Sequence, residues 1–368
     1  MLVDHVRSYG NMLSVQRQSD YPGMDILACW PEGYFPQDAK YVQMAARKCG
    51  SNGFMAEVCP FDNPEEFGKA PFDNLLATMG LNYISGVRTT QSYAEADFSA
   101  FGDGRFRDFL PRNQDMFGQV RKYFDRAQMR QLNAYVGRMG LLLDGLQNQC
   151  TTVLYFGIED VQAKYTPKHD CEVGAQAIGC DLATLRLLRA MLDEGRDFLF
   201  ADAEDLTEIA RTGRLGGEEI RRILLPGLDV IRPEALTALR QLKKAGVCVL
   251  FAEKLPHIDA LSGQQLQLAG EFEAVSVQEA VQIPDAQEPQ FKTLSGPIVR
   301  QARYRTKDSK SMFFLLNPGR TESVVRLPGA DARRCTALDP FTGTITQERL
   351  NRDWTVPAVR GIFIIIEE

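Results

Sequence analysis

The sequence predicts an α/β protein built from three consecutive parts. Residues 1–150 alternate helical patterns with short apolar runs, which is typical of parallel α/β units. Residues 151–284 repeat this alternation at a regular spacing, which predicts a doubly wound parallel sheet. Residues 285–368 change to short alternating runs between turn residues, the pattern of a small antiparallel β-sandwich.

The composition is that of an ordinary globular protein, and it argues against several kinds of partner. The 368 residues are 44% hydrophobic and 24% charged, with a net charge of −6 and no block of lysine or arginine. This balance argues against nucleic acid or an anionic membrane as the main partner. The apolar run at 361–366 is too short to span a bilayer. Residues 1–10 lack the apolar core of a signal peptide, so we expect the chain, as written, to stay in the cytoplasm.

The eight cysteines are scattered and form no C-x-x-C pair, and the chain has three histidines. This spacing argues against a zinc site or a disulfide framework. Most of the cysteines are therefore expected to be reduced and buried.

The apolar run Phe54–Val58 organises the first part. A helical pattern that stops at Gly50 precedes it, and Asn63 and Pro64 have the features of a following helix start. The run is thus expected to be a buried parallel strand with one carboxylate, Glu57, near its carboxyl end. In a barrel this is where active sites are built. The alternative is that Glu57 is a solvated or paired residue at the end of a strand.

The other elements of the first part follow from similar patterns. Met12–Gln16 is expected to be a strand, and Gly80 is expected to stop a helix before a strand at 81–84. The polar residues 88–93 would then form one wall of a pocket. Residues 115–146 have the pattern of one or two amphipathic helices that pack on the flank of the sheet.

Aromatic and turn-forming residues gather at 30–36, where Trp30 stands. Aromatic faces beside acids and amides suit sugar rings, whose C–H faces stack while their hydroxyls form hydrogen bonds. The same composition also suits any ordered loop.

The second part has five expected strands separated by helical patterns. Asp181 and Asp205 are the expected helix caps, and Pro233 opens the helix 234–245. No glycine-rich phosphate motif occurs at the strand–helix turns, and Cys248 lies inside a strand rather than on a nucleophile elbow. This part is therefore expected to be structural. The strands are expected at 152–156, 198–200, 223–225, 247–251 and 272–277.

The third part follows a proline-rich linker at 284–297. Its strands are expected between turns at Asn317-Pro318-Gly319 and 339–343. They are expected at 312–316, 323–327, 335–338, 343–347 and 361–366.

Several short motifs together point to a known family. A helix ending at 45–50 leads to the strand that carries Glu57, and Gly80-Leu81-Asn82 follows it. The order of segments from 198 to 251 and the turns in the third part match as well. In these features the chain resembles the C-terminal half of bacterial glycoside hydrolases of the α-L-rhamnosidase type, glycoside hydrolase family 106.

The resemblance implies a fold and a site. Residues 1–150 would be part of a TIM-type (β/α) barrel with flanking helices, followed by a Rossmann- or flavodoxin-like domain and a β-sandwich. The chain would hydrolyse a glycosidic bond of a carbohydrate substrate, with Glu57 as the catalytic acid or base. Asp25, Trp30, Asn82 and Tyr93 would hold the sugar. The family also allows for calcium, and no other cofactor is expected.

The chain departs from the family pattern in two ways. A histidine expected after the segment at 80–82 is missing, since Gly86-Val87-Arg88 stands there. Barrel strands before Met12 are also missing, and with them the second carboxylate that glycoside hydrolysis needs. Nothing in the spacing selects a replacement among the nearby acids, which are Asp20, Asp25, Glu32 and Asp97.

These departures leave a second interpretation open. The chain would then be a catalytically inactive carbohydrate-binding or assembly remnant of such an enzyme. In either case, an incomplete barrel predicts a homo-oligomer or a missing N-terminal part that covers the open edge.

Overall fold

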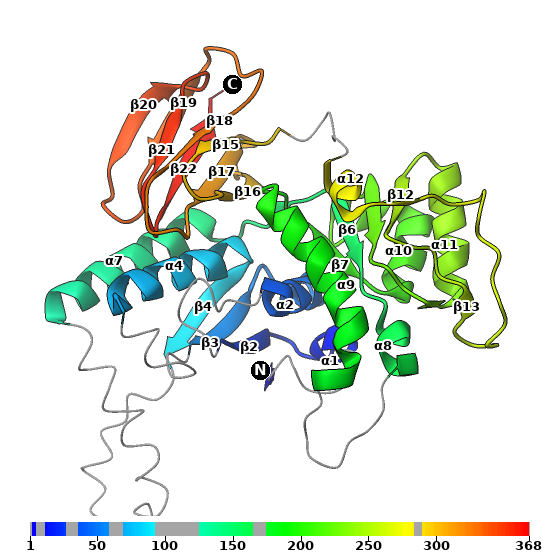
Figure 1. Cartoon of the computed structure of the whole chain (residues 1–368). Helices are drawn as coiled ribbons and strands as arrows, with labels where there is room; N and C mark the ends of the chain where they lie inside the picture. The colour runs from blue at the N-terminus through cyan, green and yellow to red at the C-terminus, as the bar shows by residue number, and fades with distance from the viewer. Residues whose placement is uncertain are drawn as a thin grey trace, which may run out of the picture.

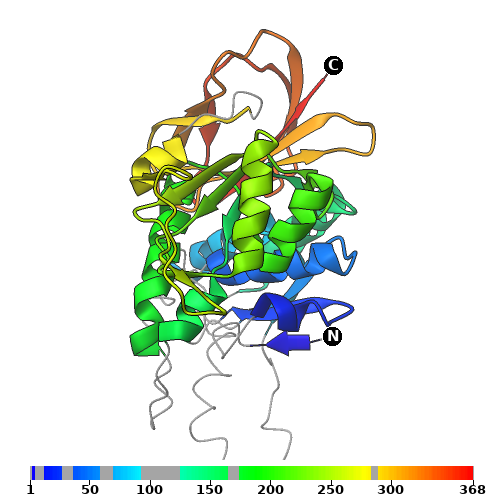
Figure 2. The same cartoon turned by 90° about the vertical axis from the view of Figure 1, so that its right-hand side faces the viewer.

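The computed structural model shows three groups of β-sheets joined by helices (Figure 1). Figure 2 shows the two ends of the chain on opposite sides of the molecule, with the N-terminus beside the first sheet and the C-terminus in the last group. The structure describes residues 2–4, 12–26, 36–58, 69–92, 125–164, 174–282 and 289–367.

The first sheet is parallel and open. Its four strands lie in chain order, and a helix lies between each strand and the next along the chain. Within the described residues the sheet does not close into a barrel. The strands are β1 (Leu2–Asp4), β2 (Pro22–Ile26), β3 (Phe54–Val58) and β4 (Val87–Ser92). The helices between them are α1 (Met12–Gln16), α2 (Pro36–Lys48) and α4 (Pro71–Ile84).

The strand at Phe54–Val58 is confirmed, but two other strand predictions in this part are wrong. Met12–Gln16 forms helix α1. The prediction failed because a short apolar run does not by itself distinguish a strand from a buried helical turn. Residues 81–84 are the last turn of α4, and the strand starts later, at Val87. The expectation that no strand precedes Met12 is also wrong, since β1 pairs with β2. The helix start expected at 63–64 lies outside the described residues.

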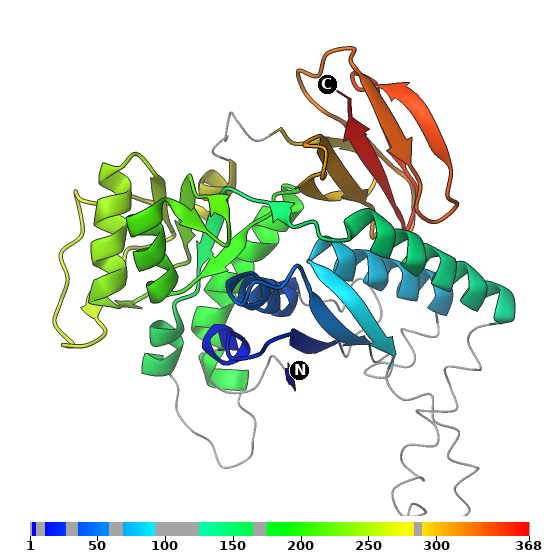
Figure 3. The same ribbon diagram turned by 180° about the vertical axis from the view of Figure 1, so that it is seen from behind.

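Gly80 lies inside α4 for a packing reason and does not end the helix. A Cβ atom at this position would lie 2.5 Å from Cδ1 of Leu316, a fully buried residue of β17 (Ser311–Leu316). The missing side chain therefore allows α4 to approach the C-terminal sheet closely. Figures 1 and 3 show α4 beside α7 (Arg126–Leu143), with the C-terminal strands above them.

The second sheet is parallel, and all five expected strands overlap an observed one. Its order is β14-β12-β10-β6-β7, the flavodoxin-type order in which the chain changes direction between β6 and β10. The strands are β6 (Thr152–Tyr155), β7 (Leu199–Ala201), β10 (Arg222–Leu225), β12 (Cys248–Ala252) and β14 (Ala274–Val275). Two small pairs lie beside it, β8 (Arg214–Leu215) with β9 (Glu218–Glu219) and β11 (Val230–Ile231) with β13 (Ile258–Asp259).

Helices cover both faces of this sheet (Figure 1). The helices are α8 (Ile158–Lys164), α9 (Gly174–Asp193), α10 (Ala203–Thr212), α11 (Pro233–Lys244) and α12 (Val277–Gln282). The expected start of α11 at Pro233 is confirmed. The two expected caps are wrong: α9 begins before Asp181, and the cap of α10 is Asp202. Asp205 instead completes a capping box, because its carboxylate accepts the N–H of Asp202.

The last group contains two antiparallel sheets that share an apolar core. The six-stranded sheet has the order β20-β19-β22-β17-β16-β5, and the three-stranded sheet has the order β15-β18-β21. Each expected strand overlaps an observed strand. The strands not yet bounded are β5 (Asn148–Gln149), β15 (Lys292–Ser295), β16 (Arg300–Arg305), β18 (Ser323–Arg326), β19 (Arg334–Leu338), β20 (Ile345–Arg349), β21 (Trp354–Val356) and β22 (Gly361–Ile366).

A buried polar cluster centred on Asn148 joins the three groups. Asn148 lies in β5 and is the register partner of Tyr304 in the C-terminal sheet. Its Oδ1 accepts hydrogen bonds from Gln43 (2.8 Å) and Arg47 (2.6 Å) of α2, and its Nδ2 donates to Asp197 in the second group. Only 2% of Asn148 is exposed, so these partners replace water.

The carboxyl-end crevice of the second sheet, where such folds bind ligands, is filled by the chain itself. A Cβ atom on Gly157 would lie 2.9 Å from atoms of the buried Leu228. The Oδ1 of Asp160 accepts the N–H groups of Asp229 and Val230 at 2.9 and 3.0 Å. Backbone N–H groups that could cradle a phosphate are thus bound to a carboxylate.

We expect Asn148→Ala to lower the free energy of unfolding by about 3 kcal/mol, because it leaves the buried Arg47 and Gln43 and the half-buried Asp197 without this partner. Urea denaturation measures the change. Asn133→Ala, at an exposed position of α7, is the matched control and should stay within about 0.5 kcal/mol of the parent. Equal stability of the two variants would contradict a central role for Asn148.

We expect Gly80→Ala to destabilise the protein by about 1–3 kcal/mol, because the added methyl group collides with Leu316. Gly137→Ala, in α7, is the control, since its Cβ would meet no atom within 4 Å. This control should be neutral or stabilising by up to about 1 kcal/mol through helix propensity. Thermal unfolding of both variants checks the difference, and a stabilised Gly80→Ala protein would refute the packing argument.

We expect the second part of the chain to bind no dinucleotide or mononucleotide, because its crevice is filled and contains the carboxylate of Asp160. Isothermal titration with NAD, ATP and FMN is the test. Binding of any of these in the micromolar range would show that the crevice opens.

Candidate functional site

The candidate site lies at the carboxyl edge of the first sheet. Glu57 is the next-to-last residue of β3 and the polar member of an otherwise apolar strand. Glu57 is half-buried, whereas its neighbours in the strand, Ala56 and Val58, are buried. A carboxylate that is partly shielded from water in this way is suited to proton transfer.

The strand register places two polar positions directly beside Glu57. The Cα of Asp25 in β2 pairs with that of Glu57, and the Cα of Glu57 pairs with that of Gln91 in β4. Neighbouring strands of a sheet lie about 4.8 Å apart. An acid, a second acid and an amide therefore follow one another across three adjacent strands. Gln91 falls in the polar stretch expected at 88–93, but only the register distinguishes it from the residues around it.

Asn82 does not lie at this edge. It is in the last turn of α4, fully buried, and its amide nitrogen and oxygen have no hydrogen-bond partner among the described residues. Because α4 leads to the start of β4, Asn82 is at the amino edge of the sheet, opposite to Glu57. The strand that would have carried its amide towards a substrate is a helix.

The remaining predicted residues are placed differently or not described. Trp30 and Tyr93 lie outside the described residues, and so do Glu32 and Asp97. Asp20 is described and exposed, in the turn before β2. Of the expected site residues, the structure thus brings the backbones of Asp25 and Glu57 together.

The resemblance suggested a calcium site, but the described part of the chain contains no cluster of acidic ligands for one. There, no group of three or more His, Cys, Asp or Glu residues is placed to hold a metal ion. Of the four cysteines whose surroundings are described, Cys150 and Cys335 are buried, Cys248 is half-buried and Cys49 is exposed, so burial holds for half of them. None of the described helices is both long and apolar enough to cross a bilayer.

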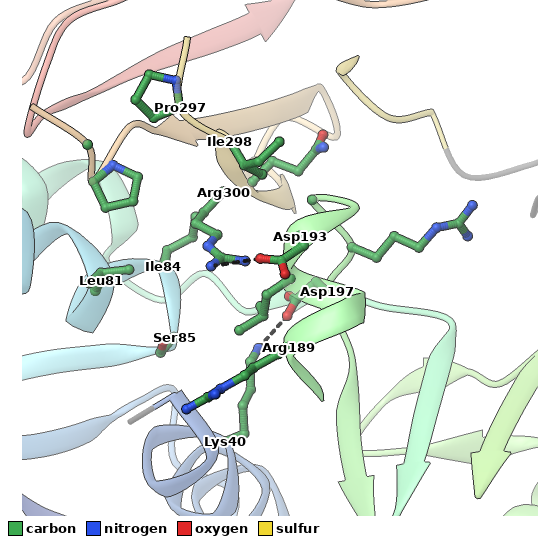
Figure 4. Close-up of a pocket in the computed structure, with 16 residues that line it drawn as sticks. Lys40, Leu81, Ile84, Ser85, Arg189, Asp193, Asp197, Pro297, Ile298 and Arg300 are labelled. Atoms are coloured by element: carbon green, nitrogen blue, oxygen red, sulfur yellow. Dashed lines mark hydrogen bonds and ion pairs between the residues drawn. The ribbon is translucent and has the colours of Figure 1, made fainter. Parts of the chain in front are cut away.

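A cavity of about 550 Å³ lies elsewhere, where α4, α9 and the start of β16 meet. Figure 4 shows Lys40 and Asp197 on one side of it and Arg300 directed towards Asp193 on another. Glu57 is not among the residues that line this cavity. The cavity and the carboxyl edge of the first sheet are therefore separate places.

Comparisons with known proteins find similarity in structure but not in sequence family. Protein-family models do not match this sequence, and neither do curated proteins. An exo-carrageenase of glycoside hydrolase family 42 from Bacteroides ovatus matches 97% of the chain with a TM-score of 0.61 and 13% identity. A rhamnosidase from Novosphingobium sp. PP1Y matches 99% with a TM-score of 0.62 and 15% identity.

An α-L-fucosidase isoenzyme from Paenibacillus thiaminolyticus also matches 99% of the chain, with a TM-score of 0.56 and 12% identity. The chain spans 49% of the exo-carrageenase, 36% of the rhamnosidase and 67% of the fucosidase. These proteins are larger than this chain, which corresponds to a portion of each. The likeness shows that the chain has a glycoside hydrolase-like fold.

Proposed function

We propose that this chain belongs to a glycoside hydrolase and that Glu57 is its catalytic acid or base. The observation that carries the proposal is the row of Asp25, Glu57 and Gln91 at the carboxyl edge of a parallel sheet. In (β/α) barrels this edge is where active sites are built. The shared fold with glycoside hydrolases supports the same conclusion.

The chemistry needs two carboxyl groups. One protonates the leaving oxygen of the glycosidic bond, while the other attacks the sugar carbon or activates a water molecule. We propose Asp25 as the second group, because its backbone is the register partner of Glu57. Trp30 and Tyr93 remain proposed sugar contacts, since both follow strands that end at this edge. Asn82 is not part of this proposal, because it is buried at the opposite edge.

For the substrate we propose an α-L-rhamnoside, on the resemblance of the sequence motifs to that enzyme type. The four described strands of the first sheet are half of the eight in a closed barrel. We propose that further strands, from another segment or a second copy of the chain, complete the enzyme. Glycosidase activity should therefore be assayed in the protein as it occurs in cells, together with the segment or second copy that completes the sheet.

We expect Glu57→Gln to lower kcat on 4-nitrophenyl α-L-rhamnoside by about 100-fold or more, because the amide can neither give nor accept the proton. Parallel assays on the β-D-galactoside and the α-L-fucoside test the sugar. Glu273→Gln, at an exposed position of the second part, is the matched control and should keep full activity.

The variant Asp25→Asn separates two roles for Asp25. A second catalytic carboxylate predicts a loss in kcat similar to that of Glu57→Gln, whereas a residue that only holds a sugar hydroxyl predicts a raised KM. Unchanged turnover in Glu57→Gln would refute the proposed site. Sugar binding by the parent protein without turnover of any of the three glycosides would instead favour the inactive remnant.

A further inference from the structure

The 550 Å³ cavity described above, here called the junction cavity, carries an excess of positive charge. Four cationic residues line it, against two carboxylates. The whole chain has a net charge of −6, so this concentration of cations runs against its overall balance. The four cations are Lys40, Arg189, Arg196 and Arg300, and the two carboxylates are Asp193 and Asp197.

One of the two carboxylates is already fully engaged. Asp197 accepts hydrogen bonds from Lys40, from Asn148 and from the backbone N–H of Phe198, the last at 2.9 Å. Lys40 in turn is 3% exposed in its side chain, and it also donates to Gln43. This pair is therefore neutralised within the protein and belongs to the cluster around Asn148.

Two of the arginines, Arg189 and Arg300, are less well compensated. The Nη2 of Arg300 lies 3.6 Å from Asp193, beyond hydrogen-bond distance, and the Asp193 side chain is 68% exposed to water while that of Arg300 is 23% exposed. The Nη1 of Arg300 has no acceptor among the described residues. Arg189 is exposed and forms no ion pair within the described part of the chain. Figure 4 shows both guanidinium groups at the cavity, Arg300 from β16 and Arg189 from α9.

Two helix ends reduce the positive charge but do not cancel it. The carboxyl ends of α4 and α9 both contribute to the cavity wall, and each carries about half a negative charge. The four cations contribute +4, the two carboxylates −2 and the two helix ends about −1 together. The net charge of the cavity wall is therefore about +1. The carbonyls of Met191 and Leu192 are also occupied, by the N–H groups of Arg196 and Gly195.

Much of the rest of the wall is apolar. Leu81 and Ile84 of α4 face the cavity from one side, and Pro297 and Ile298 from the other. Ile298 is 42% exposed, so part of its side chain is open to a ligand. The cavity also lies within the size range of small-molecule sites, about 300–1,000 Å³.

We infer that the junction cavity binds a small molecule with an apolar body and one oxyanion, which the positive charges of Arg189 and Arg300 attract. Guanidinium groups match the planar, two-pronged geometry of carboxylates, sulfates and phosphates. The apolar side of the cavity would cover the body of the ligand. This site is independent of Glu57, and bound ligand would contact all three groups of sheets at once.

Isothermal titration of the purified full chain tests the inference with probes that are not sugars. The probes are 4-nitrobenzoate, 4-nitrophenyl sulfate and 4-nitrophenyl phosphate, with 4-nitrobenzyl alcohol as the neutral match. We expect at least one anion to bind with a Kd below about 1 mM, at least tenfold more tightly than the alcohol. The strongest of the three identifies the oxyanion.

Variants assign the binding to the two arginines. Arg189→Gln and Arg300→Gln should each weaken the best anion by about tenfold or more. Arg211→Gln, an exposed arginine of α10 outside the cavity, removes the same charge and should change Kd by less than about twofold. Because Arg189 is exposed, its variant tests the site even where Arg300→Gln disturbs the fold. Equal binding of the neutral alcohol, no binding of any anion, or an unchanged Kd in Arg189→Gln would overturn the inference.

Discussion

The hydrogen bonds around Asn148 are the interaction on which the arrangement of the three groups depends. Asn148 accepts from Arg47 and Gln43, donates to Asp197, and through its backbone continues the C-terminal sheet. Burial lowers the pKa of Arg47, while the carboxylate of Glu218 at 3.7 Å and the hydrogen bond that Arg47 donates to Asn148 stabilise its charge. A buried hydrogen bond to a charged group contributes about 1.5–3 kcal/mol, so the contact between Arg47 and Asn148 favours this arrangement of the parts.

The same cluster also bears on the candidate site. Gln43 and Arg47 lie in the second half of α2, and the turn after α2 leads directly into β3, which carries Glu57. Fixing the end of α2 to the other two groups fixes the start of β3. The carboxyl end of β3, with Glu57 beside Asp25 and Gln91, is then positioned by the sheet register. A structural cluster at one edge of the sheet thus helps to position the proposed site at the other.

The two candidate sites use charge in opposite ways. At the carboxyl edge of the first sheet, acids and an amide stand in one row, which suits proton transfer and sugar hydroxyls. In the junction cavity, arginines exceed the carboxylates, which suits an oxyanion. Since different elements build the two places, substitutions at one should leave the other intact. Lys40 and Asp197 line the cavity and also belong to the cluster around Asn148. A ligand in the cavity would therefore contact the cluster that holds the three groups together.

The sequence by itself determined the α/β class, the five strands of the second sheet, most of the C-terminal strands and the strand that carries Glu57. These follow from local periodicity and turn residues, which depend on neighbouring positions in the sequence. The tertiary structure decided what Gly80 and Asn82 do, because a glycine that ends a helix and one that lets a helix approach a sheet look alike in sequence. It also decided the pairing of Asp25 and Gln91 with Glu57 and the position of Arg189 and Arg300 in the wall of one cavity. Register and long-range packing depend on residues far apart in the chain, and no local pattern contains them.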